Sequence, residues 1–342
     1  MKANVFNRHG GPDVLEYCEV ADPSIKENEV LVEVRACALN HLDVWVRNGL
    51  PRVQIDFPHI LGSDIAGIVR SVGKLVDWVQ QGDEVMLHPG VSCGHCEACL
   101  KGLDNLCPEY DIFGYRRSGG YAELVAAPGI NVMPKPKRFN WQEAAALPLV
   151  TVTAWHMLVT RANVRPGENV LVHAAGSGVG SIGIQIAKLL GARVLATAGS
   201  EEKLAKASEL GADEVINYSE KDWPREVRKL TFGRGADVVF EHTGSATWPG
   251  SIASLRNNGR LVTCGATSGF EGETDLRQIF YRHLTILGSF MGSKGELVEA
   301  MKFVEDGRLQ PVVDRAMPLA EARRAHELME DRAQFGKLVL VP

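Results

Sequence analysis

The sequence predicts an α/β protein of two domains, a mainly β domain followed by a doubly wound parallel sheet. Three observations support this prediction. At 342 residues the chain exceeds the size at which a single core usually stops growing. Short alternating strands and turn residues fill the chain to about residue 148. From residue 149 apolar strands alternate with helical segments instead.

The composition is that of an ordinary globular protein, with 45% apolar and 23% charged residues. A net charge of -5 argues against nucleic acid or an anionic membrane as a main partner. The longest apolar runs, such as residues 144–155, are shorter than a membrane-spanning helix. Residues 1–6 lack the basic and apolar pattern of an export signal, so we expect a cytoplasmic protein with a small-molecule substrate.

The first domain is predicted from alternating segments such as residues 29–34 and 66–72. Turn pairs such as Gly82-Asp83 and Pro89-Gly90 separate such segments, which indicates antiparallel strands.

The second domain is predicted from six strand candidates that alternate with helices, which is typical of a doubly wound parallel sheet. The candidates are residues 170–173, 193–197, 214–217, 237–240, 260–263 and 284–287. A helical stretch at 296–306 and a closing strand at 337–341 follow, and we expect this tail to complete the first domain. The predicted domains are therefore 1–148 with 293–342, and 149–292.

A glycine-rich loop follows the first of these strands and opens an amphipathic helix. Small residues let the backbone approach a pyrophosphate, and the N-terminus of the helix offers free N–H groups to it. This context makes the loop a strong dinucleotide signal. The expected contacts are Ala175, Ser177, Gly178, Val179 and Gly180.

The end of the second strand bears on the choice between NAD(H) and NADP(H). An NAD site normally has an acid there, which accepts from the ribose 2′-OH. Here the strand ends at Ala198, so NADP(H) is favoured over NAD(H), although Glu201 and Glu202 lie close by in the sequence. The residues expected near a 2′-phosphate are Ser200, Lys203 and Tyr218.

Four of the seven cysteines lie within fifteen positions, in the spacing Cys93-x2-Cys96-x2-Cys99-x7-Cys107. Four thiolates suit one tetrahedral zinc ion and leave no open position for substrate, so we predict one structural zinc in a lobe near 90–108. An iron–sulfur cluster is disfavoured by the seven-residue last spacing, and disulfides by the expected cytoplasmic setting.

With these motifs in hand, the chain resembles the medium-chain dehydrogenase/reductase superfamily over its whole length. The resemblance rests on Gly10-Gly11-Pro12-Asp13-Val14-Leu15, Asn40-His41-Leu42-Asp43, Gly62-Ser63-Asp64-x-x-Gly67, Gly82-Asp83-Glu84-Val85, Ala145-Ala146-Leu147-Pro148, Thr153-Ala154-Trp155, the cysteine lobe and the nucleotide loop. It implies a GroES-like substrate domain, a Rossmann cofactor domain and an active site in the cleft between them. It also implies homodimers or homotetramers assembled through Rossmann edge strands. We expect further cofactor contacts from Thr153 and Thr243.

The sequence shares features with two branches of the superfamily. In the zinc-containing alcohol dehydrogenases, a Cys-His-Cys set holds a catalytic zinc, and the matching positions here are Asn40, Ser63 and Leu149. Leu42 stands where that branch has its proton-relay Ser or Thr. The Asn-x-x-Asp and Gly-x-Asp patterns instead resemble quinone oxidoreductases and related enoyl reductases, although that branch usually lacks the zinc lobe.

The absence of catalytic zinc ligands at these positions indicates which type of reaction to expect. Oxidation of a simple alcohol removes a proton with a pKa of about 16, and zinc lowers such a value to about 7, which is worth about 12 kcal/mol. Hydride addition to a conjugated double bond or a quinone forms a delocalised anion that hydrogen bonds can stabilise. We therefore expect NADPH-dependent reduction of an enone, an enoyl thioester such as acryloyl-CoA, or a quinone, without catalytic zinc.

The expected catalytic residues are Asn40, His41 and Asp43. Asn40 would hold the nicotinamide–substrate geometry, His41 would contact pyrophosphate or substrate, and Asp43 would orient the loop. Alternatively, Asp43 caps a helix, His41 is an exposed polar residue, or a nonstandard catalytic metal binds to Cys37, His41 and Asp64. The alternative functions are an alcohol dehydrogenase or carbonyl reductase with a rebuilt active site, and a non-catalytic NADPH-binding structural protein.

Overall fold

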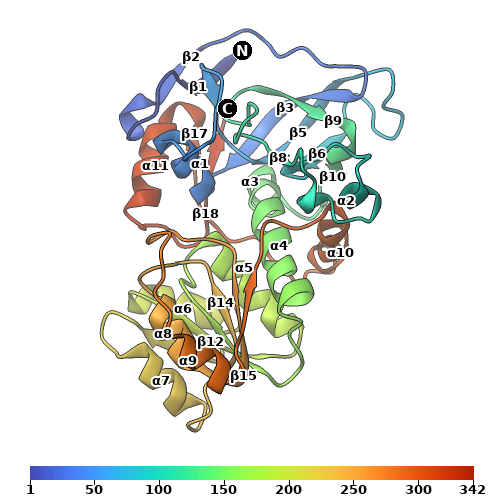
Figure 1. Ribbon diagram of the computed structural model, residues 1–342. Helices are drawn as coiled ribbons and strands as arrows, with labels where there is room; N and C mark the ends of the chain where they lie inside the picture. The colour runs from blue at the N-terminus through green and yellow to red at the C-terminus, as the bar shows by residue number, and fades with distance from the viewer. The chain divides into compact units, whose positions relative to one another are not determined.

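The computed structural model describes residues 1–342, which divide into two compact units (Figure 1). Unit 1 comprises residues 1–149, 293–298 and 311–342, and unit 2 comprises residues 150–292 and 299–310. Both chain ends belong to unit 1, because the closing strand β18 (Lys337–Val341) pairs antiparallel with β3 (Glu29–Ala38). The expectation that the tail returns to the first domain is correct for this strand.

Unit 1 is mainly antiparallel β structure. Its largest sheet has the strand order β10-β6-β5-β3-β18-β17, with β9 also paired to β3. The remaining strands of this sheet are β5 (Asp64–Val72), β6 (Glu84–Leu87), β9 (Leu124–Pro128), β10 (Val132–Pro134) and β17 (Val313–Pro318). The smaller sheets contain β1 (Lys2–Phe6), β2 (Glu16–Glu19) and β4 (His59–Ile60), and β7 (Gly90–Val91) with β8 (Asp111–Ile112). The helices are α1 (His41–Asn48), α2 (Glu97–Leu100), α3 (Trp141–Ala145) and α11 (Ala322–Glu330).

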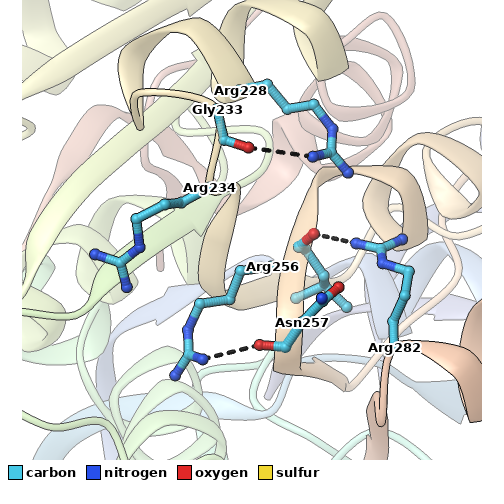
Figure 2. Close-up of a pocket in the computed structure, with 7 residues that line it drawn as sticks. Arg228, Gly233, Arg234, Arg256, Asn257 and Arg282 are labelled. Carbon is cyan, nitrogen blue, oxygen red and sulfur yellow. Dashed lines mark hydrogen bonds between the residues drawn. The ribbon is translucent and has the colours of Figure 1, made fainter.

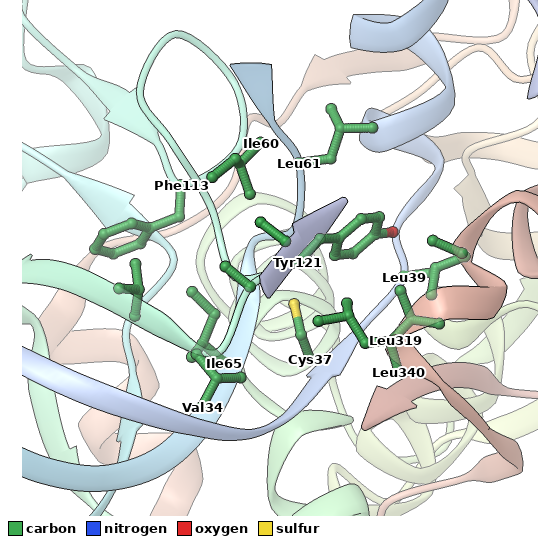
Figure 3. Packing of buried hydrophobic residues seen from close by; sticks show 14 of the residues in the cluster. Val34, Cys37, Leu39, Ile60, Leu61, Ile65, Phe113, Tyr121, Leu319 and Leu340 are labelled. Carbon is green, nitrogen blue, oxygen red and sulfur yellow. The ribbon is translucent and has the colours of Figure 1, made fainter. Parts of the chain in front are cut away.

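The core of unit 1 follows from the alternation seen in the sequence. On β3, Val30, Val32 and Val34 are buried, as the period of two in a strand requires. Figure 3 shows the buried cluster around Cys37 and Tyr121, whose ring lies inside the cluster. The tyrosine hydroxyl therefore needs a partner within the unit, and this partner is described below.

Unit 2 contains one six-stranded sheet of order β13-β12-β11-β14-β15-β16, and every pair in it is parallel. The strands are β11 (Asn169–Val172), β12 (Arg193–Ala198), β13 (Glu214–Asn217), β14 (Ala236–Glu241), β15 (Leu255–Thr263) and β16 (Thr285–Gly288). The helices between the strands are α5 (Gly178–Leu189), α6 (Glu201–Glu209), α7 (Trp223–Leu230), α8 (Trp248–Ser254) and α9 (Leu276–Tyr281). The predicted fold class is confirmed, and all six predicted strands are present.

One segment differs from its predicted domain. Residues 299–310, which include most of α10 (Lys294–Glu305), pack with unit 2 and not with unit 1. Phe303 stacks 5.3 Å from Trp155, and the backbone N–H of Gln310 donates to Gln185 Oε1 at 2.8 Å. An amphipathic pattern predicts that a helix buries one face, but it does not say against which partner.

A second difference concerns the apolar run near residue 150. Residues Trp141–Arg161 form a helical stretch of 21 residues, through α3, a turn at residues 146–147, α4 (Pro148–Trp155) and a π-helical turn, and by length and composition alone it could cross a membrane. The helical stretch is thus longer than the apolar run 144–155 on which the sequence expectation was based. However, 83% of its apolar window is buried inside the protein, so its apolar surface packs as a core helix does.

Candidate functional site

The glycine-rich loop lies between β11 and α5, where the dinucleotide signal predicts it. The backbone N–H of Ala175 donates to Thr197 O at 2.9 Å, which holds the loop against β12. Ala174 adopts the left-handed conformation with φ +45°, which is uncommon for a residue other than glycine. A Cβ on Gly180 would lie 2.3 Å from Ala174 O, so this position admits no side chain.

The first turn of α5 shows which donors remain for a ligand. Ser177 caps the helix, and its hydroxyl oxygen accepts from the N–H of Gly180 at 2.8 Å. The N–H groups of Gly178 and Val179 belong to the same turn and have no partner inside the helix. The loop therefore offers backbone donors to an anion, as the sequence predicts.

Glu201 and Glu202, whose negative charges would disfavour NADP(H), follow β12, and each has a partner within the protein. Glu201 Oε1 accepts from Asn217 Nδ2 at 3.1 Å, and Glu202 pairs with Lys206 at 2.8 Å on α6. Ser200 caps α6 and accepts from the N–H of Lys203 at 3.4 Å. The structure thus places Ser200 and Lys203 together in the first turn of α6.

The three other predicted cofactor residues lie in different settings. Tyr218 follows β13, is 47% exposed, and packs on Gly199, where a Cβ would lie 2.7 Å from its hydroxyl. Thr153 is buried on α4, with its hydroxyl 4.0 Å from Met291 Sδ. The backbone N–H of Thr243 donates to the carboxylate of Glu241, a residue that is not among the predicted site residues.

Glu241 is the last residue of β14 and is fully buried. It accepts from the N–H groups of Thr243 and Gly244 at 2.6 and 3.1 Å and from Ser251 Oγ at 2.6 Å. Burial opposes ionisation, but His173 and these hydrogen bonds outweigh it and hold the pKa of Glu241 below its ordinary value. The carboxylate therefore fixes the backbone that follows β14. In the sequence, its only signal is an acid at the end of a buried strand.

In unit 1, Asn40 lies in a buried polar cluster with Asp64 and Lys337. Lys337 Nζ donates to Asn40 Oδ1 at 2.6 Å and to Asp64 Oδ2 at 2.8 Å, and Asn40 Nδ2 donates to Asp64 Oδ2 at 2.9 Å. The second oxygen of Asp64 accepts from the N–H of Leu149 at 2.7 Å. Asp64 is fully buried and Lys337 is 4% exposed. An ammonium group thus contacts Asn40, one of the positions that match zinc ligands, and no local sequence signal predicts this contact.

The chemistry of these contacts fixes the orientation of the Asn40 amide. An ammonium group only donates, so the atom facing Lys337 is the amide oxygen, and the NH₂ group faces Asp64. Of the two N–H bonds of the Asn40 amide, one donates to Asp64, and the other is left to donate to a ligand. Lys337 likewise uses two of its three N–H bonds in this cluster. The cluster therefore holds two oriented donors next to a carboxylate.

Asp43 is the third residue of α1 and completes the capping box of this helix with the N-cap residue Asn40, which agrees with the alternative that Asp43 caps a helix. Its Oδ2 accepts from the N–H of Asn40 at 2.8 Å and from the Tyr121 hydroxyl at 3.0 Å, and its Oδ1 accepts from the N–H of Gly62 at 3.2 Å. Burial raises the pKa of Asp43 to about 6, although these hydrogen bonds oppose the rise. Asp43 therefore joins Asn40 to the loop at Gly62, and its predicted orienting role agrees with these contacts.

The Tyr121 hydroxyl continues this network toward α11. His326 Nδ1 lies 2.8 Å from Arg47 Nη1, and His326 Nε2 lies 3.3 Å from the Tyr121 hydroxyl. Arginine only donates, so His326 Nδ1 accepts and the proton resides on Nε2. Arg47 is the last side chain of this network on the α1 side, and it forms an ion pair of 2.7 Å with Glu330 of α11. Burial and the positive charge of Arg47 lower the pKa of His326 to about 3, so this histidine is neutral.

His41 is the first residue of α1, and its ring lies 5.0 Å from that of Trp45. Burial and the positive charge of Arg332 lower the pKa of His41. The alternative of a metal held by Cys37, His41 and Asp64 is wrong, because these residues form no group with close ligand atoms. Their spacing in the sequence could not show that Asp64 is already paired with Lys337.

The cysteine quartet is brought together as predicted. The four sulfur atoms lie within 4.8 Å of one another, with Sγ–Sγ distances of 3.9 Å for Cys93 and Cys99 and 3.6 Å for Cys96 and Cys99. A tetrahedral zinc with Zn–S bonds of about 2.3 Å requires sulfur atoms about 3.8 Å apart. The N–H of Cys96 points to Cys93 Sγ at 3.3 Å, and the N–H of Cys93 points to Cys107 Sγ at 3.5 Å. All cysteines of the chain are free thiols, and the donor set fits zinc.

Comparisons with known proteins find a family model that matches a segment of each unit. Residues 26–137 match the family model of the alcohol dehydrogenase GroES-like domain, and residues 178–306 match that of the zinc-binding dehydrogenases. Crotonyl-CoA carboxylase/reductase of Cereibacter sphaeroides is 33% identical over 94% of this chain and 82% of its own length. Quinone oxidoreductase 1 of Escherichia coli is 30% identical over 98% of both chains. A crystal structure of an NAD-dependent alcohol dehydrogenase is 52% identical over the full length of both chains, with a TM-score of 0.97.

Proposed function

Because the chain belongs to the medium-chain dehydrogenase/reductase superfamily and is an oxidoreductase of that type, we propose that it reduces an activated C=C bond or a quinone with NADPH and without catalytic zinc. The observation that carries this proposal is the buried Asn40–Asp64–Lys337 cluster. Asn40 of this cluster stands at a position that matches a zinc ligand in the alcohol dehydrogenases of the superfamily, and Asp64 accepts from the N–H of Leu149, another such position.

When bound, NADPH supplies the hydride. The substrate then carries a delocalised negative charge on its carbonyl or quinone oxygen. The remaining N–H of Asn40 can donate to that oxygen, and Lys337 holds this amide in the donating orientation. A preorganised donor of this kind contributes about 2.7–4 kcal/mol to the transition state. That is sufficient for an enolate or phenolate but far below the roughly 12 kcal/mol that deprotonation of a simple alcohol needs.

The substrate class is tested with a panel of small enones, crotonyl-type thioesters and quinones, followed by NADPH consumption. Turnover on this panel without added metal is expected. A chain that does not turn over any of these substrates, but oxidises alcohols in a chelator-sensitive way, would refute the proposal. NADPH binding without turnover of either kind would instead favour a non-catalytic role.

An alcohol dehydrogenase is the second candidate, favoured by the 52% identity to a structure named NAD-dependent alcohol dehydrogenase. An alcohol dehydrogenase of this type needs a metal ion to lower the pKa of the alcohol. Asp64 is already paired with Lys337, so this pair supplies no open position for a metal ion. Metal content separates the two candidates. We propose one structural zinc per chain on the cysteine quartet, and elemental analysis that finds two would support the alcohol dehydrogenase.

The preference for NADPH rests on the end of β12. Ala198 offers no carboxylate, and Glu201 and Glu202 have other partners. Lys203 lies at the start of the same helix and can contribute a charge-assisted hydrogen bond to a 2′-phosphate. Lys203→Gln should therefore weaken kcat/KM for NADPH by about tenfold or more and leave NADH unaffected. The matched control is Lys206→Gln, and equal effects of the two substitutions would contradict the assignment.

We further propose that two copies associate through β16, the edge strand of the sheet in unit 2. One side of β16 pairs with β15, and the other has no strand beside it. Its Ile286 is 40% exposed, and Phe280 and Tyr281 of the preceding helix α9 are 60% and 74% exposed. An unpaired edge flanked by exposed apolar side chains is a template for pairing with another chain. Light scattering should report a homodimer or a homotetramer.

A further inference from the structure

Unit 2 contains a cavity of about 430 Å³ that is lined by four arginines (Figure 2). Arg228 comes from α7, Arg234 from the turn before β14, Arg256 from the start of β15, and Arg282 from the end of α9. The other lining residues are Gly233, Leu255 and Asn257, so no acidic residue lines the cavity.

The cavity lies at the opposite edge of the sheet from the nucleotide loop. Ala236 begins β14 and pairs with Leu255, the first residue of β15, so Arg234 and Arg256 mark the amino edge of these parallel strands. The nucleotide loop follows the carboxyl end of β11, on the other edge. β14 spans five residue steps of about 3.3 Å, so the two edges are about 16 Å apart. The cavity is therefore separate from the predicted cofactor site.

The positive charge around this cavity is largely uncompensated. Asp237 is the carboxylate that pairs with these arginines, and it serves both Arg256 and, at 3.8 Å, Arg234. Arg228 Nη2 donates to Ala253 O at 2.7 Å, and Arg282 Nη1 donates to Ile252 O at 3.2 Å. These last two contacts reach neutral carbonyls.

The contacts with carbonyl oxygens explain the orientation of the Arg228 and Arg282 side chains. They do not explain why four arginines lie around one cavity. Ile252 O and Ala253 O lie in the last turn of α8, where cations interact favourably with the helix dipole. One arginine would be enough for such a cap. Burial and the positive charge of Arg228 lower the pKa of Arg282, as expected for two guanidinium groups of like charge near each other. An anion between them would relieve this repulsion.

We propose that this cavity binds a small phosphate-bearing anion at a site distinct from that of the cofactor. Arginine is the side chain best suited to phosphate, because its planar fork donates two parallel hydrogen bonds to two oxygens. The cavity volume lies within the range of small-molecule sites and exceeds the space that one phosphate group needs. The cavity therefore has room for pyrophosphate or for a larger phosphorylated molecule such as a nucleotide. This inference goes beyond the proposed reductase function and does not depend on it.

The test is calorimetric titration of the full-length protein, first alone and then with saturating NADPH, so that binding at the phosphate sites of the cofactor is told apart from binding in the cavity. Pyrophosphate, inorganic phosphate and ATP are the probes. Pyrophosphate should bind at millimolar concentration or below, and Arg228→Gln should weaken it by about tenfold or more through the loss of a charge-assisted hydrogen bond. Tighter binding of ATP than of pyrophosphate would identify a nucleotide, and equal binding would identify the phosphate group itself as what is recognised.

The matched control is Arg225→Gln, which removes an exposed arginine from the same helix outside the cavity. It should leave the titration unchanged. Arg234→Gln provides a second variant that preserves the fold, because this side chain is 64% exposed and makes only a long ion pair. The proposal is overturned if millimolar pyrophosphate gives no binding heat, or if Arg225→Gln weakens binding as much as the cavity variants do.

Discussion

Replacement of Lys337 by methionine tests the buried cluster most directly. Methionine fills a similar volume but removes the ammonium group that holds Asn40 Oδ1 and Asp64 Oδ2. Asp64 would then be a fully buried carboxylate without a cation. Breaking a buried pair in this way costs about 3–5 kcal/mol of unfolding free energy. The Asn40 amide also loses the contact that orients it, so kcat should fall by about 10²–10³, the effect of losing one oxyanion donor.

The assay separates these two effects. Urea unfolding measures stability, and NADPH consumption by the folded fraction measures kcat for the best substrate of the panel. Lys135→Met is the matched control, because Lys135 is also a buried lysine of unit 1, with its Nζ 2.8 Å from Phe139 O. It should lower stability without a specific loss of kcat.

A double variant distinguishes an electrostatic role from a packing role. Lys337→Met with Asp64→Asn removes both charges, so most of the lost stability should return while kcat stays low. If kcat returns together with stability, the ammonium group acts only in packing. If Lys337→Met alone keeps its full kcat, the proposed role of the cluster in the reaction is refuted.

Three further predictions concern pH, zinc and assembly. Folded Asp43 binds a proton up to a pKa of about 6, above its ordinary 3.8, so stability should fall as pH rises from about 4 to about 6, by about 3 kcal/mol. Asp43→Asn should flatten this slope in urea titrations, and an unchanged slope would contradict the assignment. Cys99→Ser should reduce zinc below one ion per chain by elemental analysis, whereas Cys18→Ser should not. Ile286→Lys should shift light scattering toward the monomer if β16 is the interface; an unchanged mass would exclude that edge.

Much of the fold could be predicted because its signals are local. Strand and helix periods repeat within a few residues, so the six strands of unit 2 and its nucleotide loop were recognisable. The cysteine quartet is likewise close in sequence, and the structure brings its sulfur atoms together. The prediction that Asn40, Ser63 and Leu149 replace the usual zinc ligands required only a comparison of residue types, and it stays a prediction.

What the sequence did not predict depends on contacts between distant segments. Lys337 reaches Asn40 across 297 positions, and Tyr121 reaches His326 across 205. The pattern of residues 337–341 predicted a strand but gave no sign that its first side chain is a buried cation. The assignment of residues 299–310 failed for the same reason, since an apolar helix face does not name its partner.

The sequence by itself thus determined the fold class and the spacing of the cysteine quartet, and it predicted the nucleotide loop and the loss of the zinc ligands. The tertiary structure decided what contacts Asn40, one of those positions, namely a lysine ammonium that holds both this asparagine and Asp64. The physical reason is that periodicity and spacing record which face of an element is buried. The partner of a buried charge is fixed only when strands from opposite ends of the chain pair, as β3 and β18 do here.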